Sequence, residues 1–276
     1  MGEGAYQYLE GFLRGRMTVV KQVSPQLRVA VIGAGNVAGH LAEALARVGC
    51  LAGVWSRNGN HASSIAAPLN VPGGAMSDLP RDLDIYILSV KDDAIPSVSA
   101  VIGPVAGIVA HTSGTVSMDV LVRERRGVFY PLQTFSSNRQ IDMSEVPFFI
   151  EGSDADVSET LMNLALCISS NVRYAGSDIR ATLHLAAVFA CNFTNHLWAI
   201  AEDILRREAG CSLDVFAPLL HETLAKAIEC GAGISQTGPA ARGDIHTIKK
   251  HLQRLDGLRE KIYQIVSQDI MNNNQN

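Results

Sequence analysis

The sequence predicts an α/β protein in which a doubly wound parallel sheet is followed by an all-helical C-terminal domain. Three observations support this fold class. An apolar strand ends at a glycine-rich turn, and a helix pattern starts directly behind it, within residues 27–39. Strand and helix patterns then alternate as far as about residue 152. Beyond that residue, almost every apolar pattern has the helical period.

The glycine turn between the first strand and the first helix has the form of a dinucleotide-binding Rossmann motif. Gly33 permits a tight turn and Gly35 lets the backbone approach the phosphates, while Ala38 and Gly39 keep the helix close to the strand. The helix N-terminus supplies free N–H groups to the anion. The same motif can also be a purely structural turn. We predict that it binds the cofactor through Gly33, Gly35, Asn36 and Val37.

The end of the second strand indicates which dinucleotide is bound. Residues 51–55 form an apolar strand pattern that leads into Ser56 and Arg57, where an NAD-preferring site usually has Asp or Glu. A guanidinium pairs with the 2′-phosphate of NADP, which an acidic side chain would repel. Alternatively, Arg57 is a solvated loop residue. We predict NADP as the cofactor, with Ser56 and Arg57 among its contacts.

Composition limits the other function classes. The 276 residues carry a net charge of −4 and no long basic run, which argues against nucleic acid as a partner. Five cysteines without a C-x-x-C pair predict reduced thiols, with neither a disulfide framework nor a metal site. No apolar stretch reaches membrane-spanning length, so we expect a cytoplasmic protein. Residues 1–26 are predicted to be an extension that carries no chemistry.

Two later strands end in polar residues that we expect beside the cofactor. Residues 84–90 form a buried strand pattern that ends at Val90 and Lys91, and residues 107–114 form another that contains Ser113. Ligands of such sheets lie beyond the carboxyl ends of the strands. Ser113 or His111 could donate to a substrate carbonyl or carboxylate, or Ser113 and Thr112 could cap a helix that begins near Val116. Residues 128–130 and 146–150 are further candidate strands.

The C-terminal part is predicted to be a separate helical domain. We place the Rossmann domain at residues 27–152 and the helical domain at 153–276, with helices at 158–168, 179–209, 212–230 and 244–270 and one more short strand at 171–176.

Polar residues in this helical domain are candidates for the substrate site. His184 and Asn192 share one face of an otherwise apolar helix, where they contact a substrate or satisfy a helix interface. Residues 238–244 form a turn in which Asp244 can cap the next helix and Arg242 can clamp an anion. The alternative for this turn is a capped interhelical loop.

Taken together, these motifs carry a family resemblance. The glycine turn, His111-Thr-Ser-Gly114, Tyr130-Pro-Leu-Gln-Thr-Phe135, the Asn192 helix and the turn at 238–244 resemble the Rossmann-like DUF2520 proteins over nearly all of the chain after residue 26. That family is similar in plan to pyrroline-5-carboxylate reductases, ketopantoate reductases and 6-phosphogluconate dehydrogenases. The resemblance implies an NADP oxidoreductase that dimerises through its helical domain. This chain has Tyr130 where the family usually has His, and no lysine near His184 and Asn192.

The working hypothesis is hydride transfer between NADPH and a small carbonyl or imine substrate that bears a carboxylate. His184 would act as general acid or base, Asn192 and Ser113 would orient the substrate, and Arg242, with Asp244 beside it, would neutralise the carboxylate. Two other functions stay open. The protein could be a non-catalytic NADP(H) sensor or scaffold, because a fold does not fix a function, or a methyltransferase built on the same type of sheet.

Overall fold

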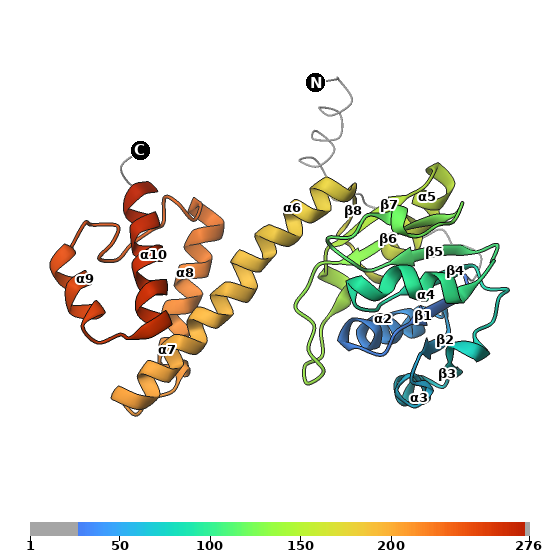
Figure 1. Ribbon diagram of the computed structural model, residues 1–276, viewed down its shortest axis with the longest axis horizontal. Coiled ribbons are helices and arrows are strands. Elements are labelled where there is room, and N and C mark those ends of the chain that lie inside the picture. Colours follow the sequence, from blue (N-terminus) through green and yellow to red (C-terminus); the bar gives the residue numbers. More distant parts are fainter. Residues whose placement is uncertain (1–26, 274–276) are drawn as a thin grey trace, which may run out of the picture. The chain divides into compact units, whose positions relative to one another are not determined.

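The computed structural model describes residues 27–273 and divides into two compact units, with Val188 the last residue of the first and Phe189 the first of the second (Figure 1). We call the described residues up to 188 the sheet unit, and residues 189–273 the helical unit. No helix within residues 27–273 is long and apolar enough to cross a membrane.

The sheet unit is built on one eight-stranded sheet in the order β3-β2-β1-β4-β5-β6-β7-β8. Its strands are parallel except at the β6–β7 pair, which is antiparallel. The strands are β1 (Val29–Ile32), β2 (Leu51–Ser56), β3 (Gly73–Ala75), β4 (Ile85–Leu88), β5 (Ile108–His111), β6 (Arg126–Pro131), β7 (Phe148–Gly152) and β8 (Val172–Tyr174). The predicted α/β fold class is confirmed.

Helices cover both faces of this sheet because the strand side chains alternate between them. Val29 and Val31 of β1 belong to the same buried cluster as residues of α2, α3 and α5, whereas Ala30 and Ile32 belong to the cluster that contains α4. The helices of this unit are α2 (Asn36–Arg47), α3 (Gly59–Ala66), α4 (Ile95–Ile102), α5 (Ala155–Ile168) and α6 (Ser177–Ala187). Both strand faces are therefore apolar, as expected for a parallel sheet.

The sheet unit extends further along the chain than the predicted domain boundary after residue 152. Helix α5 follows that boundary, yet its buried face packs into the sheet core through residues such as Leu161. Strand β8 then pairs with β7 and closes the sheet edge. Strand β3 is absent from the sequence-based description, because its Gly-Gly-Ala sequence carries no apolar alternation.

The helical unit contains four helices among the described residues: α7 (Thr194–Glu208), α8 (Ala217–Cys230), α9 (Ile245–Leu252) and α10 (Gly257–Asn273). The helix predicted over residues 179–209 is interrupted by π-helical geometry at Val188–Phe193. The helix predicted over 244–270 is broken between α9 and α10, where Gly257 has a φ of 56°. Asp244 caps α9 as predicted, since its carboxylate accepts a hydrogen bond from the Thr247 backbone at 3.0 Å.

Candidate active site

The turn between β1 and α2 requires glycine at its first position. Gly33 has a φ of 138°, and a side chain there would collide with the Ser89 carbonyl oxygen. Strands β1 and β4 approach so closely at this point because the backbone N–H of Ser89, directly after β4, donates to the Ile32 carbonyl of β1 at 2.7 Å. Gly35 is the N-cap of α2, and a Cβ on it would meet no atom within 4 Å. Open space therefore lies in front of a helix N-terminus whose first turn has no acidic residue, as an anion site requires.

One expectation about this turn is corrected. Ala38 is fully buried and lets α2 pack closely against the sheet, as predicted. Gly39 does not contribute to this packing, because a Cβ at that position would also meet no atom within 4 Å.

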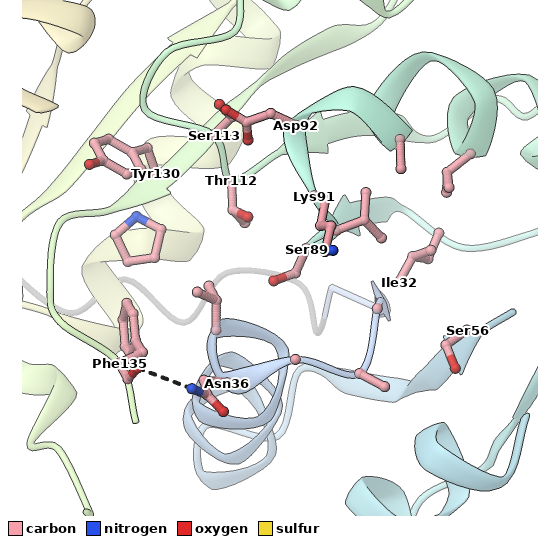
Figure 2. Close-up of a pocket in the computed structure, with 18 of the residues that line it drawn as sticks. Ile32, Asn36, Ser56, Ser89, Lys91, Asp92, Thr112, Ser113, Tyr130 and Phe135 are labelled. Atoms are coloured by element: carbon pink, nitrogen blue, oxygen red, sulfur yellow. Dashed lines mark hydrogen bonds between the residues drawn. The ribbon is translucent and has the colours of Figure 1, made fainter. Parts of the chain in front are cut away.

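The glycine turn opens onto a pocket of about 1050 Å³ beyond the carboxyl ends of the parallel strands (Figure 2). This volume is at the upper end of the range for small-molecule sites, which suits a dinucleotide and a small substrate. All eight cofactor contacts predicted from the sequence line the pocket, namely Gly33, Gly35, Asn36, Val37, Ser56, Arg57, Val90 and Lys91. Ser113 and Tyr130 lie across the pocket from Ser56 in the close-up, with the glycine turn between the two ends.

The end near β2 is suited to a 2′-phosphate. Ser56 donates its hydroxyl hydrogen to the Asn58 carbonyl at 2.6 Å, which fixes the turn before α3. Asn58 then caps α3, and Arg57 and His61 line the pocket beside it. Asp92 is the sole acidic residue among the described lining residues, and it follows β4. His61 was not predicted from the sequence as a pocket residue. It belongs to α3 and follows Arg57 by four residues.

At the other end, the loop after β5 is folded around the Ser113 side chain. Its hydroxyl oxygen accepts hydrogen bonds from the backbone N–H groups of Thr115 and Val116, each at 3.1 Å. The α-helix predicted to begin near Val116 does not form. A 3₁₀ turn at Met118–Val120, capped by Ser117, stands there instead. Ser113 lines the pocket, and its hydroxyl oxygen lies 3.5 Å from that of Thr115, whose own hydrogen is donated to Asp92. The Ser113 hydroxyl hydrogen therefore has Thr115 as one acceptor within reach, besides any group in the pocket.

His111 supports this loop from behind and does not line the pocket. It is fully buried in β5, and its Nδ1 accepts from the Ser113 backbone N–H at 3.2 Å. Burial and the nearby Arg180 guanidinium lower the pKa of His111 to about 4. His111 is therefore neutral at physiological pH.

Tyr130 and His184 form a hydrogen-bonded pair in the same pocket. The Tyr130 hydroxyl oxygen lies 2.9 Å from His184 Nδ1, and both side chains line the pocket. Gly114 packs against the pair, because a Cβ there would lie 2.7 Å from His184 Nδ1 and 2.8 Å from the Tyr130 hydroxyl. Burial raises the pKa of Tyr130 to about 12, so the phenol stays protonated. The sequence placed His184 on a polar helix face, but it gave no partner for it.

A buried arginine joins the Ser113 loop to α6, the helix that carries His184. The Arg180 side chain is fully buried and forms an ion pair with Glu151 of β7. Its guanidinium also donates to the carbonyl oxygens of Ser113, at 3.1 Å, and Val116. Arg180 lies one helical turn before His184 on α6. Its contacts therefore hold the Ser113 loop and the part of α6 that carries His184 in place.

The loop after β6 is tied to the glycine turn. The Asn36 side-chain amide donates to the Phe135 carbonyl at 3.2 Å (Figure 2). The Nε2 atom of His40 lies 3.0 Å from the Ser136 carbonyl oxygen, and the His40 and Phe135 rings are in contact, with centroids 5.3 Å apart. These contacts hold residues 131–135 beside the start of α2.

The remaining predicted site residues belong to the helical unit. Asn192 lies in the π-helical segment with an exposed side chain. Arg242 is exposed in the turn before α9, and Asp244 is engaged as the cap of that helix. The neighbouring Arg242 charge and the hydrogen bonds from Thr247 hold the pKa of Asp244 below its usual value, with the hydrogen bonds the larger cause. None of the three is among the described lining residues of the pocket, and their roles stay predictions.

Comparisons with known proteins agree with this geometry. Residues 28–109 match the family profile described as NADP oxidoreductase coenzyme F420-dependent, and residues 146–270 match the domain of unknown function DUF2520. A candidate NADP oxidoreductase from Bacteroides fragilis is 36% identical, with a TM-score of 0.83 over 90% of this chain and 98% of that one. A Thermotoga maritima protein is 20% identical, with a TM-score of 0.67 over 90% of this chain and 98% of its own. No curated protein matches the chain.

The fold and the pocket define a Rossmann-type, nucleotide-dependent oxidoreductase. More particularly, the chain belongs to the family of NADP oxidoreductases in which a Rossmann-like domain is followed by a DUF2520 domain. NADP is the cofactor of this family.

Proposed function

We propose that the protein transfers a hydride between NADPH and a small carbonyl or imine substrate that carries a carboxylate. One observation supports this function most strongly. The pocket that holds the glycine turn and Arg57 also holds Ser113 and the Tyr130–His184 pair. A cofactor-binding surface and groups that can exchange a proton thus share one cavity, as reduction of a polar double bond requires.

The residues of the pocket fit NADPH by their chemistry. The open space at Gly35 and the helix N-terminus suit the pyrophosphate, and Arg57 with His61 suits the 2′-phosphate. When bound, the cofactor supplies the hydride. The protein's own contributions are to bind it, to orient the substrate and to handle the accompanying proton.

The assigned roles follow from the side chains. His184 exchanges the proton, and the Ser113 hydroxyl hydrogen-bonds the carbonyl oxygen or imine nitrogen. Asn192 is proposed to orient the substrate, and Arg242 to neutralise its carboxylate.

Two solved proteins of similar fold are an imine reductase and a reductive aminase. An imine reductase from Myxococcus stipitatus, solved with NADP⁺, is 16% identical with a TM-score of 0.59, over 89% of this chain and 92% of that one. A reductive aminase from Aspergillus terreus, solved with NADPH and ethyl levulinate, is 12% identical with a TM-score of 0.55, over 83% and 78%. At these identities the likeness concerns the fold, and it is consistent with carbonyl and imine substrates.

The experiment that tests the role of His184 compares His184→Ala with His221→Ala, an exposed histidine on α8. On a panel of 2-oxo acids and cyclic imino acids, His184→Ala should lower kcat on the order of a hundredfold or more, with the Kd for NADPH within about twofold of wild type. Equal losses of turnover and cofactor affinity, or no loss, would reject this role.

The alternative function is a non-catalytic NADP(H) sensor. Residues 177–200, which contain His184 and Asn192, hold no lysine, and this observation favours the alternative. A sensor would bind NADPH and NADP⁺ with clearly different affinities and change its oligomeric state between them, without turnover of any member of the panel.

We also propose that a second copy of the chain covers the helical unit. Large apolar side chains lie exposed on α7, α8 and the segment before α7, and no residue of α7 or α8 is buried. We call this set the apolar helical surface: Phe189, Phe193, Leu197, Trp198, Leu219, Leu224 and Ile228. So many exposed apolar residues on two helices are typical of an association surface.

A further inference from the structure

The Tyr130 hydroxyl contacts His184, and the Tyr130 side chain also lines the pocket. Tyr130 is only 6% exposed, and what it exposes faces the pocket that it lines with Ser113 and Gly114. Its phenol oxygen lies 2.9 Å from His184 Nδ1. The residue is thus buried by the fold, open to the pocket and bonded to the histidine that we assign to proton exchange.

The fold fixes this pairing from several directions. Tyr130 lies in β6, opposite Phe149 of β7, and the two rings lie 6.3 Å apart between centroids. His184 is held on α6, whose Arg180 bonds to the Ser113 loop. Gly114 leaves no room for a side chain against either ring. Neither ring can turn far without disturbing one of these contacts.

The hydrogen bond determines how a proton can leave His184. Its Nδ1 is occupied by the phenol oxygen, so a proton on that nitrogen reaches a substrate only by way of Tyr130. When His184 carries both ring protons, Nδ1–H donates to the phenol oxygen, and the phenol hydrogen is then free to point into the pocket. When His184 is neutral, the phenol donates to Nδ1 instead.

We propose that Tyr130 is a catalytic residue that delivers the proton to the substrate, with His184 replacing that proton through the hydrogen bond between them. The proposal rests on the proposed reductase function. As the substrate carbon accepts the hydride, the phenol O–H bond breaks and a new O–H or N–H bond forms on the substrate. The Nδ1 proton moves to the phenol oxygen, and the pair ends neutral. A proton from solvent later restores it, so one hydride and one proton enter the substrate in each turnover.

The charges around Tyr130 are compatible with this role. Burial is the largest influence and raises the pKa of the phenol, while the Arg180 guanidinium opposes the rise and Asp92 adds to it. His184 is the remaining titratable group in contact. Tyr130 therefore does not remain as a phenolate after it gives up its proton, because His184 supplies a replacement at once.

A matched pair of variants tests the proposal. Tyr130→Phe removes the phenol oxygen from the pocket, and Tyr86→Phe removes that of another buried tyrosine, which donates to the Pro80 carbonyl at 3.0 Å and does not line the pocket. Three measurements are made on both: the Kd for NADPH, turnover of the 2-oxo acid and cyclic imino acid panel, and the ¹⁵N NMR resonances of the His184 ring without cofactor.

The expected result separates the two variants. Tyr130→Phe should lower kcat on the order of a hundredfold or more and shift the His184 Nδ1 resonance, with the Kd for NADPH within about twofold of wild type. Tyr86→Phe should change none of the three.

Other results overturn specific statements. If Tyr130→Phe retains wild-type kcat, or leaves the Nδ1 resonance in place, Tyr130 does not relay the proton, even where the reductase function stands. If wild-type protein binds no NADPH, the proposed function itself fails.

Discussion

The sheet unit and the helical unit differ most in how much of their apolar surface is buried. In the sheet unit, strand and helix residues form three buried clusters that together cover both faces of the sheet. In the helical unit, Ala240, Ile248 and Ser267 are the buried residues among those described, although its helices are rich in Leu and Ile. The sheet unit therefore has a core of its own, whereas the helical unit leaves almost all of its apolar side chains at least partly exposed.

This difference indicates how the two regions contribute to function. A rigid, fully packed sheet places Gly33, Ser113 and Tyr130 at defined positions, as binding and proton transfer require. A unit with few buried groups is expected to gain its stability by association.

The largest effect is expected on the apolar helical surface. Leu224 and Ile228 lie one turn apart on α8, with 61% and 76% of their surfaces exposed. Replacing both with Asp should raise the dissociation constant of a dimer by at least about ten-thousandfold, since burial of each such side chain contributes about 1.5–3 kcal/mol and a twofold interface contains each twice. Analytical ultracentrifugation measures this. Val122→Asp, at a 92% exposed residue of the sheet unit, is the control. A dimer that survives the double substitution would place the interface elsewhere.

The next effect concerns the buried Arg180 in the sheet unit. Arg180→Met should lower the free energy of unfolding by about 3–5 kcal/mol, because it leaves Glu151 without its partner and two loop carbonyls without donors. Arg28→Met is the control, since its ion pair with Asp82 is exposed to solvent and is expected to contribute little to stability. Urea denaturation compares the two variants. Equal losses would mean that the Arg180 network does not stabilise the pocket.

A smaller effect is a pH dependence of stability that arises from His111. Its pKa is lowered from 6.5 to about 4 in the folded protein, so the unfolded chain binds the proton first as the pH falls. The free energy of unfolding should therefore decrease between about pH 6.5 and pH 4, by up to about 3 kcal/mol. His111→Asn should flatten this slope, whereas His221→Asn should not. An unchanged slope in His111→Asn would contradict this assignment.

The sequence was sufficient to predict every strand of the sheet except β3, and to predict the pocket residues that follow β1 and β2. The residues concerned are local in the chain: Gly33 and Gly35 follow one strand, and Arg57 follows the next. In a parallel sheet the carboxyl ends of neighbouring strands share an edge, so local patterns are enough to bring such residues together.

The pocket residues that we assign to proton transfer could not be predicted from local sequence patterns. Tyr130 and His184 are 54 residues apart and come from a strand and a helix, and no spacing rule relates them. In the sequence, Arg180 resembles an ordinary helix-surface residue, because its partners Glu151 and the Ser113 carbonyl lie 29 and 67 residues away. The helix expected near Val116 did not form, because Ser113 and Ser117 satisfy the local N–H groups within turns.

The measurement that tests the central claim most directly is a fluorescence titration of wild type and Arg57→Ala with NADPH and NADH. Arg47→Ala, at an exposed arginine of α2 that does not line the pocket, serves as control. The pocket described here predicts that wild type prefers NADPH, that Arg57→Ala weakens NADPH binding by about 1–3 kcal/mol, and that NADH binding hardly changes. No binding of either nucleotide to wild type would contradict the assignment of this pocket to NADP.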